Sequence, residues 1–394
     1  MKQKIGNQIG HIDWFIFLPV AGLLLFSMVF VYSASAPISA EKFGSVDKLF
    51  INQAIRVVFS LIILVIFSKI DYHIYQKIAK PIILTAIALL ILVLIVGDEL
   101  KGARRWVLFG PFSIQPVEYA KFAIVIYFSV LLVKKQKVIK TFNEGFVPFL
   151  FWIAIICVLI ALQPNFSNMF LVFIIAMTMM FVGNTNLLHL ITTVAIGIVG
   201  AGMYAVSAPY RMARILAYFE VGNTSPNITK YQLQQALIAL GNGGFLGLGP
   251  GQSRQSYLFL PESYGDFIFS TIGEEYGFLG LLLIFAAFGL IFFRGMLVAK
   301  KAPDILGYFL AIGIILTLAI YLFTNAAVNT GLLPTTGVPL PFLSYGGTAV
   351  LVYSAVIGIL LNISAQANVY TITNPVISKK SNEKNDKNIN LQNE

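Results

Sequence analysis

Three acidic side chains lie close together in an otherwise apolar part of the chain. Asp266 follows a polar stretch and begins a long apolar run, and Glu274 and Glu275 follow about two helical turns later. An ionisable group at membrane depth costs about 2.5–3.5 kcal/mol or more unless it faces protein or water. The whole chain has only 17 acidic residues. Three acidic residues in one apolar segment therefore predict a functional site, with a carboxylate that could act as a general base.

The three acids allow different interpretations. Asp266 could be the N-cap of the following helix, because an aspartate there accepts hydrogen bonds from free backbone N–H groups. It could also be a general base that faces an outer cavity, and one residue can serve both roles. Glu274 shares a helix face with Ser270 and Gly277, a stripe of small residues that permits close helix packing. We expect Glu274 and Glu275 to be structural support for the helix that holds Asp266.

A charged pair lies at the start of another apolar run. Glu118 and Lys121 are spaced i, i+3 shortly after Pro116, which suits the first turn of a helix. They could form a structural ion pair that makes two charges tolerable near the membrane. Alternatively, they could contact Asp266 or an anionic substrate. The residues alone leave both interpretations open.

Four arginines, Arg104, Arg105, Arg211 and Arg214, lie in polar segments between apolar runs. Arginine binds phosphate oxygens in a bidentate manner and is always charged. These side chains could therefore hold lipid headgroups or the pyrophosphate of a lipid-linked substrate. The sequence shows no metal-ligand spacing, and its 3 histidines are scattered. The glycine-rich stretch 241–249 lacks the lysine and hydroxyl residue of a phosphate-binding loop.

The composition places these residues in a membrane. The chain is 58% hydrophobic and 11% charged, whereas soluble domains carry about 25% charged residues. A membrane helix needs about 20 apolar residues, and ten such runs predict an all-α polytopic protein with ten transmembrane helices. The runs lie near residues 12–34, 49–68, 76–97, 117–133, 146–163, 166–184, 187–207, 266–293, 304–329 and 346–364.

The lysines and arginines predict the orientation. Most of the 27 lie in the terminal segments or at the same ends of the runs, which places both termini in the cytoplasm. The long connection at about 208–265, between the seventh and eighth helices, is then extracytoplasmic. The irregular segments 100–116 and 329–347 share that side, where broken backbone can line a cavity. We expect residues 1–377 to form one membrane domain and residues 378–394 a disordered cytoplasmic tail. The net charge of +10 reflects topology and does not indicate nucleic-acid binding.

Five stretches of the chain resemble one known family. They are similar, in order and in sequence, to the signature segments of SEDS proteins, the FtsW/RodA family. The stretches are residues 105–118, 163–166, 260–269, 272–275 and 329–347. The similarity covers nearly the whole membrane part, and the last stretch alone is very specific. Within the family, the residues at 251–255 and 272–275 look more like the FtsW branch than the RodA branch.

The resemblance implies a peptidoglycan glycosyltransferase of the bacterial inner membrane, at the division septum. It would polymerise lipid II at the outer face, release undecaprenyl pyrophosphate, and work with a class B penicillin-binding transpeptidase and other division proteins. The family's essential aspartate corresponds to Asp266, and a divalent cation (Mg or Mn) could assist. The expected substrate-binding residues are Arg105, Lys121, Glu118, Arg211, Arg214 and Ser344. Asn165 stands where many members have an aspartate, so an acid role at that position is in doubt for this chain.

Other functions fit parts of the same pattern. Broken helices and charges inside a membrane are also features of transporters, so a lipid II flippase is an alternative. A RodA-type elongation polymerase and a non-catalytic scaffold for division enzymes are further interpretations. The charged and irregular segments gather on one side of the membrane rather than at its midplane, which favours the glycosyltransferase.

Overall fold

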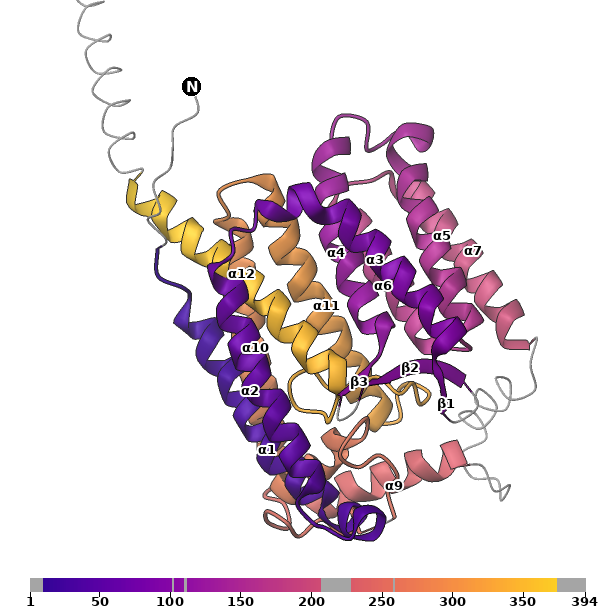
Figure 1. Ribbon diagram of the computed structural model, residues 1–394, viewed down its shortest axis with the longest axis vertical. Helices are drawn as coiled ribbons and strands as arrows, with labels where there is room; N and C mark the ends of the chain where they lie inside the picture. The colour runs from indigo at the N-terminus through magenta and orange to yellow at the C-terminus, as the bar shows by residue number, and fades with distance from the viewer. Residues whose placement is uncertain (1–9, 101–102, 110–111, 207–227, 258, 374–394) are drawn as a thin grey trace, which may run out of the picture.

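The structure, a computed structural model, describes residues 10–100, 103–109, 112–206, 228–257 and 259–373. These residues form a bundle of long helices with a small sheet at one end (Figure 1). The helices are α1 (Trp14–Phe43), α2 (Lys48–Lys69), α3 (Ile74–Val96), α4 (Pro116–Lys135), a π-helical turn η1 (Phe142–Phe146), α5 (Val147–Leu162), α6 (Phe166–Val182), α7 (Leu187–Val206), α9 (Ile228–Gly243), α10 (Ile268–Lys300), α11 (Ile305–Asn329) and α12 (Gly347–Thr373).

Eight of the described helices are long and apolar enough to cross a membrane. They are α1, α2, α3, α4, η1 with α5, α10, α11 and α12. Two further apolar helices, Phe166–Val182 in α6 and Leu187–Gly200 in α7, are shorter. Each of the ten predicted runs therefore contains a helix, and eight of these helices have the expected length. The long connection between the seventh and eighth predicted runs contains a further helix, α9.

The prediction of an all-α protein is wrong in one place. Between α3 and α4, the chain forms a three-stranded antiparallel sheet of β1 (Asp98–Leu100), β2 (Ala103–Phe109) and β3 (Phe112–Ile114). The sheet is joined to α12, because the Thr348 hydroxyl donates to the Ser113 carbonyl at 2.9 Å and accepts from the Gln115 N–H at 2.8 Å. These contacts place the start of α4 beside the start of α12.

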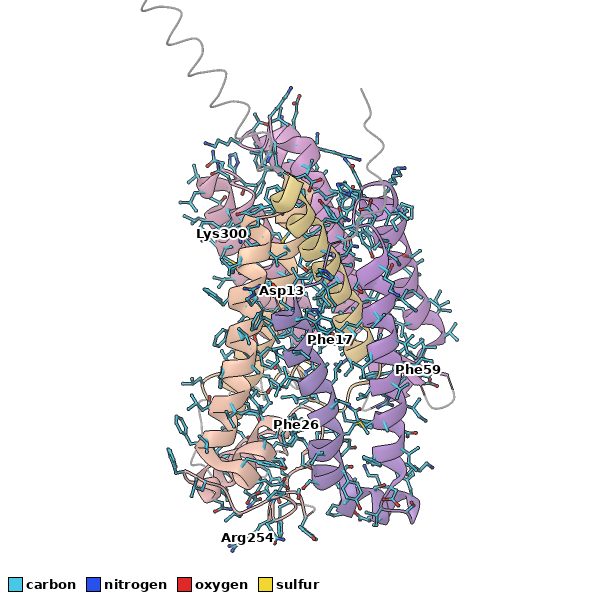
Figure 2. The ribbon with its side chains drawn as sticks, turned by 90° about the vertical axis from the view of Figure 1, so that its left-hand side faces the viewer. Asp13, Phe17, Phe26, Phe59, Arg254 and Lys300 are labelled. Carbon is cyan, nitrogen blue, oxygen red and sulfur yellow. The ribbon has the colours of Figure 1, made fainter. Side chains whose placement is uncertain are left out.

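Three helices form the centre of the bundle. In α4, α11 and α12, 83%, 72% and 78% of the most apolar window is buried, against at most 39% in the other five spans. The outer helices expose large apolar side chains, such as Phe26 on α1 and Phe59 on α2 (Figure 2). A helix with an exposed apolar surface is suited to contact with lipid, and the polar side chains described below face the protein interior instead.

The helix α10 bends sharply at Gly277, which has a positive φ of 63°. A straight helix would separate residues 269 and 285 by about 24 Å, yet the rings of Phe269 and Phe285 lie only 5.9 Å apart. The bend frees backbone groups, and the turn after α9 satisfies them. The N–H groups of residues 278 and 279 donate to the carbonyls of residues 244 and 245, at 2.9 and 3.1 Å. The first part of α10 is therefore a separate helical segment, held against α9.

The molecule has two distinct ends. The sheet, α9, the start of α4 and the end of α11 lie at one end, which we call the sheet end (Figure 1). The start of α1 and the end of α10 lie at the opposite end. Figure 2 shows Arg254 at the sheet end and Lys300 near the opposite end. The irregular segments predicted to share one side of the membrane are thus gathered at the sheet end.

Candidate functional site

Asp266 lies at the sheet end, in the connection that leads into α10. The helix begins at Ile268 and its N-cap residue is Phe267, so Asp266 stands one position before the N-cap. The N-cap interpretation of Asp266 is therefore wrong. The Asp266 residue is half-buried, which places its carboxylate between the protein interior and the space outside.

The backbone before Asp266 is held by the segment that precedes α12. The Tyr345 N–H donates to the Tyr264 carbonyl at 2.9 Å, and the Ser344 hydroxyl donates to the Gly265 carbonyl, also at 2.9 Å. Ser344 is 1% exposed, and its hydroxyl also accepts from the Leu340 N–H at 2.7 Å. Ser344 therefore holds the connection that carries Asp266, and its contact with substrate stays a prediction.

Two asparagines of α11 hold the carbonyl of Asp266 itself. The side-chain amides of Asn325 and Asn329 donate to this carbonyl at 2.9 and 3.1 Å. Asn325 also donates to the Val338 carbonyl at 2.8 Å, and the Asn329 amide oxygen accepts from the Ser270 hydroxyl at 2.7 Å. Three successive carbonyls, of residues 264 to 266, thus accept hydrogen bonds from elements distant in sequence. This preorganises the position of the Asp266 side chain.

The irregular segment between α11 and α12 approaches the Asp266 carboxylate. Gly337 has a φ of +70°, and a Cβ atom at this position would lie 3.3 Å from Asp266 Oδ2. The expectation that residues 329–347 are not regular helix is confirmed, because α11 ends at Asn329 and α12 begins at Gly347. The glycine allows this backbone to pass close to the carboxylate.

Glu118 and Lys121 form a buried ion pair on α4. Their carboxylate and ammonium groups are 2.8 Å apart, and the two residues are 1% and 0% exposed. The second Glu118 oxygen accepts from the Tyr321 and Tyr353 hydroxyls at 2.9 and 3.3 Å, and the ammonium lies 4.4 Å from the Tyr321 ring centroid. The pair is satisfied within the protein, as the structural interpretation requires. One of its partners, Tyr353, contacts the segment between α11 and α12, since its ring lies 5.9 Å from that of Phe342.

The arginines are placed differently from one another. Arg105 on β2 donates from Nε to the Gln163 carbonyl at 3.1 Å and from its terminal nitrogen to the Pro164 carbonyl. Its guanidinium thus holds the turn between α5 and α6, whereas Arg104 is exposed. Arg211 and Arg214 lie outside the described residues. Arg105 therefore has a structural contact through Nε and one terminal nitrogen, and its contact with a phosphate stays a prediction.

Asn165, the position at which the family resemblance led us to expect an aspartate, is the N-cap residue of α6. Its amide oxygen accepts from the Asn168 side chain at 2.9 Å, and both residues are buried. The Asn165 Nδ2 and Asn168 Oδ1 atoms have no hydrogen-bond partner among the described residues. The two amides pair with each other, so the contact at the start of α6 is a neutral one.

Glu274 and Glu275 lie at the bend of α10. The Glu274 carboxylate accepts from the Asn242 amide at 3.0 Å, the Ser253 hydroxyl at 2.5 Å and the Gln255 N–H at 3.1 Å. Glu275 accepts from the Ser33 hydroxyl of α1. Both lie about two helical turns after Asp266, in the segment of α10 that ends at the bend at Gly277. Both glutamates are buried, and the hydrogen bonds to Glu274 hold residues 242–256 against the bend of α10.

Sequence reasoning missed several residues of the site. Asn325 and Asn329 gave a usable signal, since two amides spaced i, i+4 on an apolar helix share one face. No sequence pattern pointed to Tyr264, although the charge of the Asp266 carboxylate acts on its hydroxyl. Burial, followed by the nearby charges of Glu262, Tyr345 and Asp266, raises the pKa of Tyr264 to about 12. Its phenol therefore stays protonated at neutral pH and can donate a hydrogen bond.

No group of three or more His, Cys, Asp or Glu side chains that could hold a metal occurs among the described residues. A Mg²⁺ ion is often bound by one or two carboxylates together with substrate phosphates. Asp266 is one such carboxylate. The residues therefore fit a cation shared with a bound pyrophosphate better than a cation held by the protein alone.

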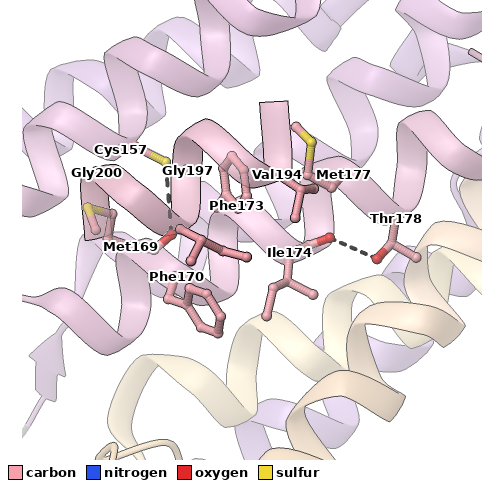
Figure 3. A pocket seen from close by; sticks show the side chains of 11 residues that line it. Cys157, Met169, Phe170, Phe173, Ile174, Met177, Thr178, Val194, Gly197 and Gly200 are labelled. Carbon is pink, nitrogen blue, oxygen red and sulfur yellow. Dashed lines mark hydrogen bonds between the residues drawn. The ribbon is translucent and has the colours of Figure 1, made fainter. Parts of the chain in front are cut away.

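A separate pocket of about 480 Å³ lies between α5, α6 and α7 (Figure 3). Its lining is almost wholly apolar and includes Cys157, Phe173 and Gly197. None of the predicted site residues lines it. It is distinct from the polar site around Asp266.

The sequence as a whole matches known proteins over nearly its full length. The family described as "Cell cycle protein", which unites FtsW, RodA and SpoVE, matches residues 13–369. The chain is 37% identical over 362 residues to a probable peptidoglycan glycosyltransferase FtsW of Geobacter metallireducens, covering 91% of this chain and 96% of that protein. It is 38% identical over 346 residues to stage V sporulation protein E of Bacillus subtilis, covering 87% and 94%.

Solved structures share the fold. A chain of a peptidoglycan synthase complex that coordinates polymerization and crosslinking is similar with a TM-score of 0.75 at 23% identity, covering 90% of this chain and 98% of that one. The rod shape determining protein RodA of Thermus thermophilus is similar with a TM-score of 0.65 at 22% identity, covering 90% and 96%. The multi-helix architecture and the length of the sequence match lead to one conclusion: the chain is a multi-pass membrane protein that belongs to the FtsW/RodA/SpoVE family.

Proposed function

We propose that this protein is a peptidoglycan glycosyltransferase of the FtsW type that polymerises lipid II, with Asp266 as the general base. The observation that carries the proposal is a half-buried carboxylate whose backbone is held at three successive carbonyls. The relatives named as peptidoglycan glycosyltransferases support the same reaction class.

In the proposed reaction, a sugar hydroxyl of the acceptor gives its proton to the Asp266 carboxylate. The oxygen then attacks the anomeric carbon of the donor, and undecaprenyl pyrophosphate leaves with the bonding electrons. A single displacement of this kind inverts the anomeric centre and needs one base and no covalent intermediate. A fixed carboxylate suits this step, because the rate of a proton transfer depends on a well-defined approach geometry.

The pyrophosphate leaves with negative charge, and positively charged groups would stabilise it. Arg211 and Arg214 are the proposed arginine contacts, since Arg105 is engaged with the turn between α5 and α6. A divalent cation would supply further charge and polarise the pyrophosphate when bound, and the Asp266 carboxylate would be its candidate protein ligand. The family likeness adds a class B penicillin-binding transpeptidase and other division proteins as partners.

The proposed topology has ten membrane-spanning helices with both termini in the cytoplasm of the cell. The shorter helices α6 and α7 complete the ten, and the sheet end faces outward, with the connection at 208–265 outside. Residues 1–377 would form the membrane domain and residues 378–394 a cytoplasmic tail. The protein would lie in the bacterial inner membrane, at the septum. A thiol reagent that cannot cross the membrane would report the side on which an introduced cysteine at position 47 lies.

The test of the base is the substitution Asp266→Asn in the full-length protein, assayed with lipid II and its transpeptidase partner. Removing the base should lower glycan formation at least 100-fold, while the carbonyl contacts of residue 266 keep the fold intact. Asp47→Asn is the matched control, because Asp47 is an exposed acid at the sheet end without a side-chain cap bond. Wild-type polymerisation by Asp266→Asn would rule out Asp266 as the base. Movement of labelled lipid II across vesicles by such a variant would favour a flippase.

A further inference from the structure

Arg56 is a buried cation in the apolar helix α2. It is 3% exposed, and its guanidinium carbon lies 4.2 Å from the centroid of the Tyr345 ring. A buried cation is costly unless neighbouring groups stabilise it. The face of an aromatic ring does so through its negative quadrupole, and the effect is largest where water is excluded. The placement of Arg56 on this ring is therefore a specific interaction.

Tyr345 connects Arg56 to the connection that carries Asp266. Its N–H donates to the Tyr264 carbonyl at 2.9 Å, and the two tyrosine rings meet edge to face with centroids 5.4 Å apart. Tyr264 stands two residues before Asp266 and within the electrostatic influence of the Glu262 and Asp266 carboxylates. The Arg56 guanidinium is thus linked through the Tyr345 and Tyr264 rings to the two nearby carboxylates.

We propose that Arg56 is a positioning residue, whose guanidinium fixes the Tyr345 ring and, through Tyr345 and Tyr264, the place of the Asp266 carboxylate. The inference rests on the proposed role of Asp266 as the base. Arg56 does not touch substrate in this arrangement, because it is buried beneath Tyr345. Its contribution is geometric: a catalytic group must be held within about 0.5 Å of its productive position, and small displacements lower the rate strongly.

The test measures kcat and KM for lipid II in four single variants of the full-length protein. Arg56→Met keeps an unbranched apolar stem but removes the guanidinium and its charge, and Tyr345→Leu removes the ring face. Both should lower kcat about 10-fold or more and change KM by less than about twofold, because ground-state binding is left in place. Arg56→Lys keeps a cation and Tyr345→Phe keeps the ring, so both should retain most of the wild-type kcat.

The double variant Arg56→Met with Tyr345→Leu tests whether the two residues act as a unit. If they do, its kcat should be no lower than that of the more impaired single variant, since two parts of one interaction are not additive. Arg294→Met is the matched control. That guanidinium lies 5.0 Å from the Phe15 ring at the opposite end, so its loss should lower thermal stability and leave kcat unchanged.

Several results would overturn the inference: a wild-type kcat in Arg56→Met, a multiplicative loss in the double variant, or a kcat in Arg56→Lys as low as in Arg56→Met. If Arg56→Met does not fold, Arg56→Lys and the two Tyr345 variants decide the question. Asp266→Asn, assayed in parallel, separates the two proposals. An active Asp266→Asn overturns the base, whereas an inactive Asp266→Asn beside a fully active Arg56→Met overturns only the role of Arg56.

Discussion

At the scale of single residues, the ion pair of Glu118 and Lys121 shows how the bundle tolerates charge. Both groups are removed from solvent, and each has a second partner, the tyrosine hydroxyls for the carboxylate and the Tyr321 ring for the ammonium. Removing one member of a buried pair leaves the other charge uncompensated, whereas removing both can be nearly neutral. The pair therefore acts as a unit.

We expect the single substitutions Glu118→Gln and Lys121→Met each to lower the free energy of unfolding by about 3–5 kcal/mol. The combined substitution should cost clearly less than the sum of the two, because neither charge is then left alone. Thermal unfolding of the detergent-solubilised protein measures all three. Additive losses would show that the two groups are stabilised independently of each other.

At the scale of elements, the bend of α10 decides how the chain enters the site. Gly247 and Gly277 pack backbone against backbone, and a Cβ atom on Gly277 would lie 2.4 Å from the Gly247 nitrogen and 2.5 Å from the Phe245 carbonyl oxygen. The positive φ at Gly277 is a second reason why only glycine suits this position. The bend allows the segment before it to carry Asp266 to the asparagines of α11.

Gly277→Ala should therefore lower the free energy of unfolding by more than about 2 kcal/mol, from the left-handed conformation and the clash together. It should also lower polymerisation, because the segment that follows Asp266 would shift. Gly289→Ala in the same helix is the control, since a Cβ there meets nothing within 4 Å and alanine favours a helix by about 1 kcal/mol. Equal melting temperatures for the two variants would contradict the role of the bend.

At the scale of the whole molecule, a charged cluster at the opposite end joins three parts of the chain. His73 lies 2.7 Å from Asp71, in the connection between α2 and α3, and 3.1 Å from Asp304, the N-cap of α11. Gln366 of α12 donates to Asp71 at 2.9 Å. The hydrogen bond to Asp304, together with the hydrogen bond and charge of Asp71, raises the pKa of His73 to about 9, although partial burial opposes the shift.

A raised pKa in the folded state makes the stability depend on pH. The contribution of protonated His73 should be fully present below its unfolded pKa of about 6.5, decline as pH rises, and be absent above about 9. Because the side chain is 42% exposed, solvent screening reduces the effect to about 1 kcal/mol. Melting temperatures between pH 6 and pH 10 should fall more steeply for the wild type than for His73→Gln. Parallel pH profiles would show that the cluster does not stabilise the fold.

Much of the architecture was predictable, because apolar runs of membrane length report directly on helices. All ten predicted runs contain a helix, and the irregular segment after Asn329 was also placed correctly. The sheet at residues 98–114 was missed. Its strands are only three to seven residues long, and in β2 the alternating pattern of a strand is obscured by adjacent arginines and aromatic residues.

The sequence by itself determined that this is a multi-pass membrane protein of a known family, and that Asp266 is its candidate base. Only the tertiary structure decided what the surrounding polar residues do. Ser344 and Arg56 lie far from Asp266 along the chain, and their contacts depend on which helices are neighbours. Hydrophobic periodicity tells which face of a helix is buried, but not what it meets there. For that reason the buried contacts of Ser344, predicted to bind substrate, and of Arg56, not singled out at all, became visible only in the tertiary structure.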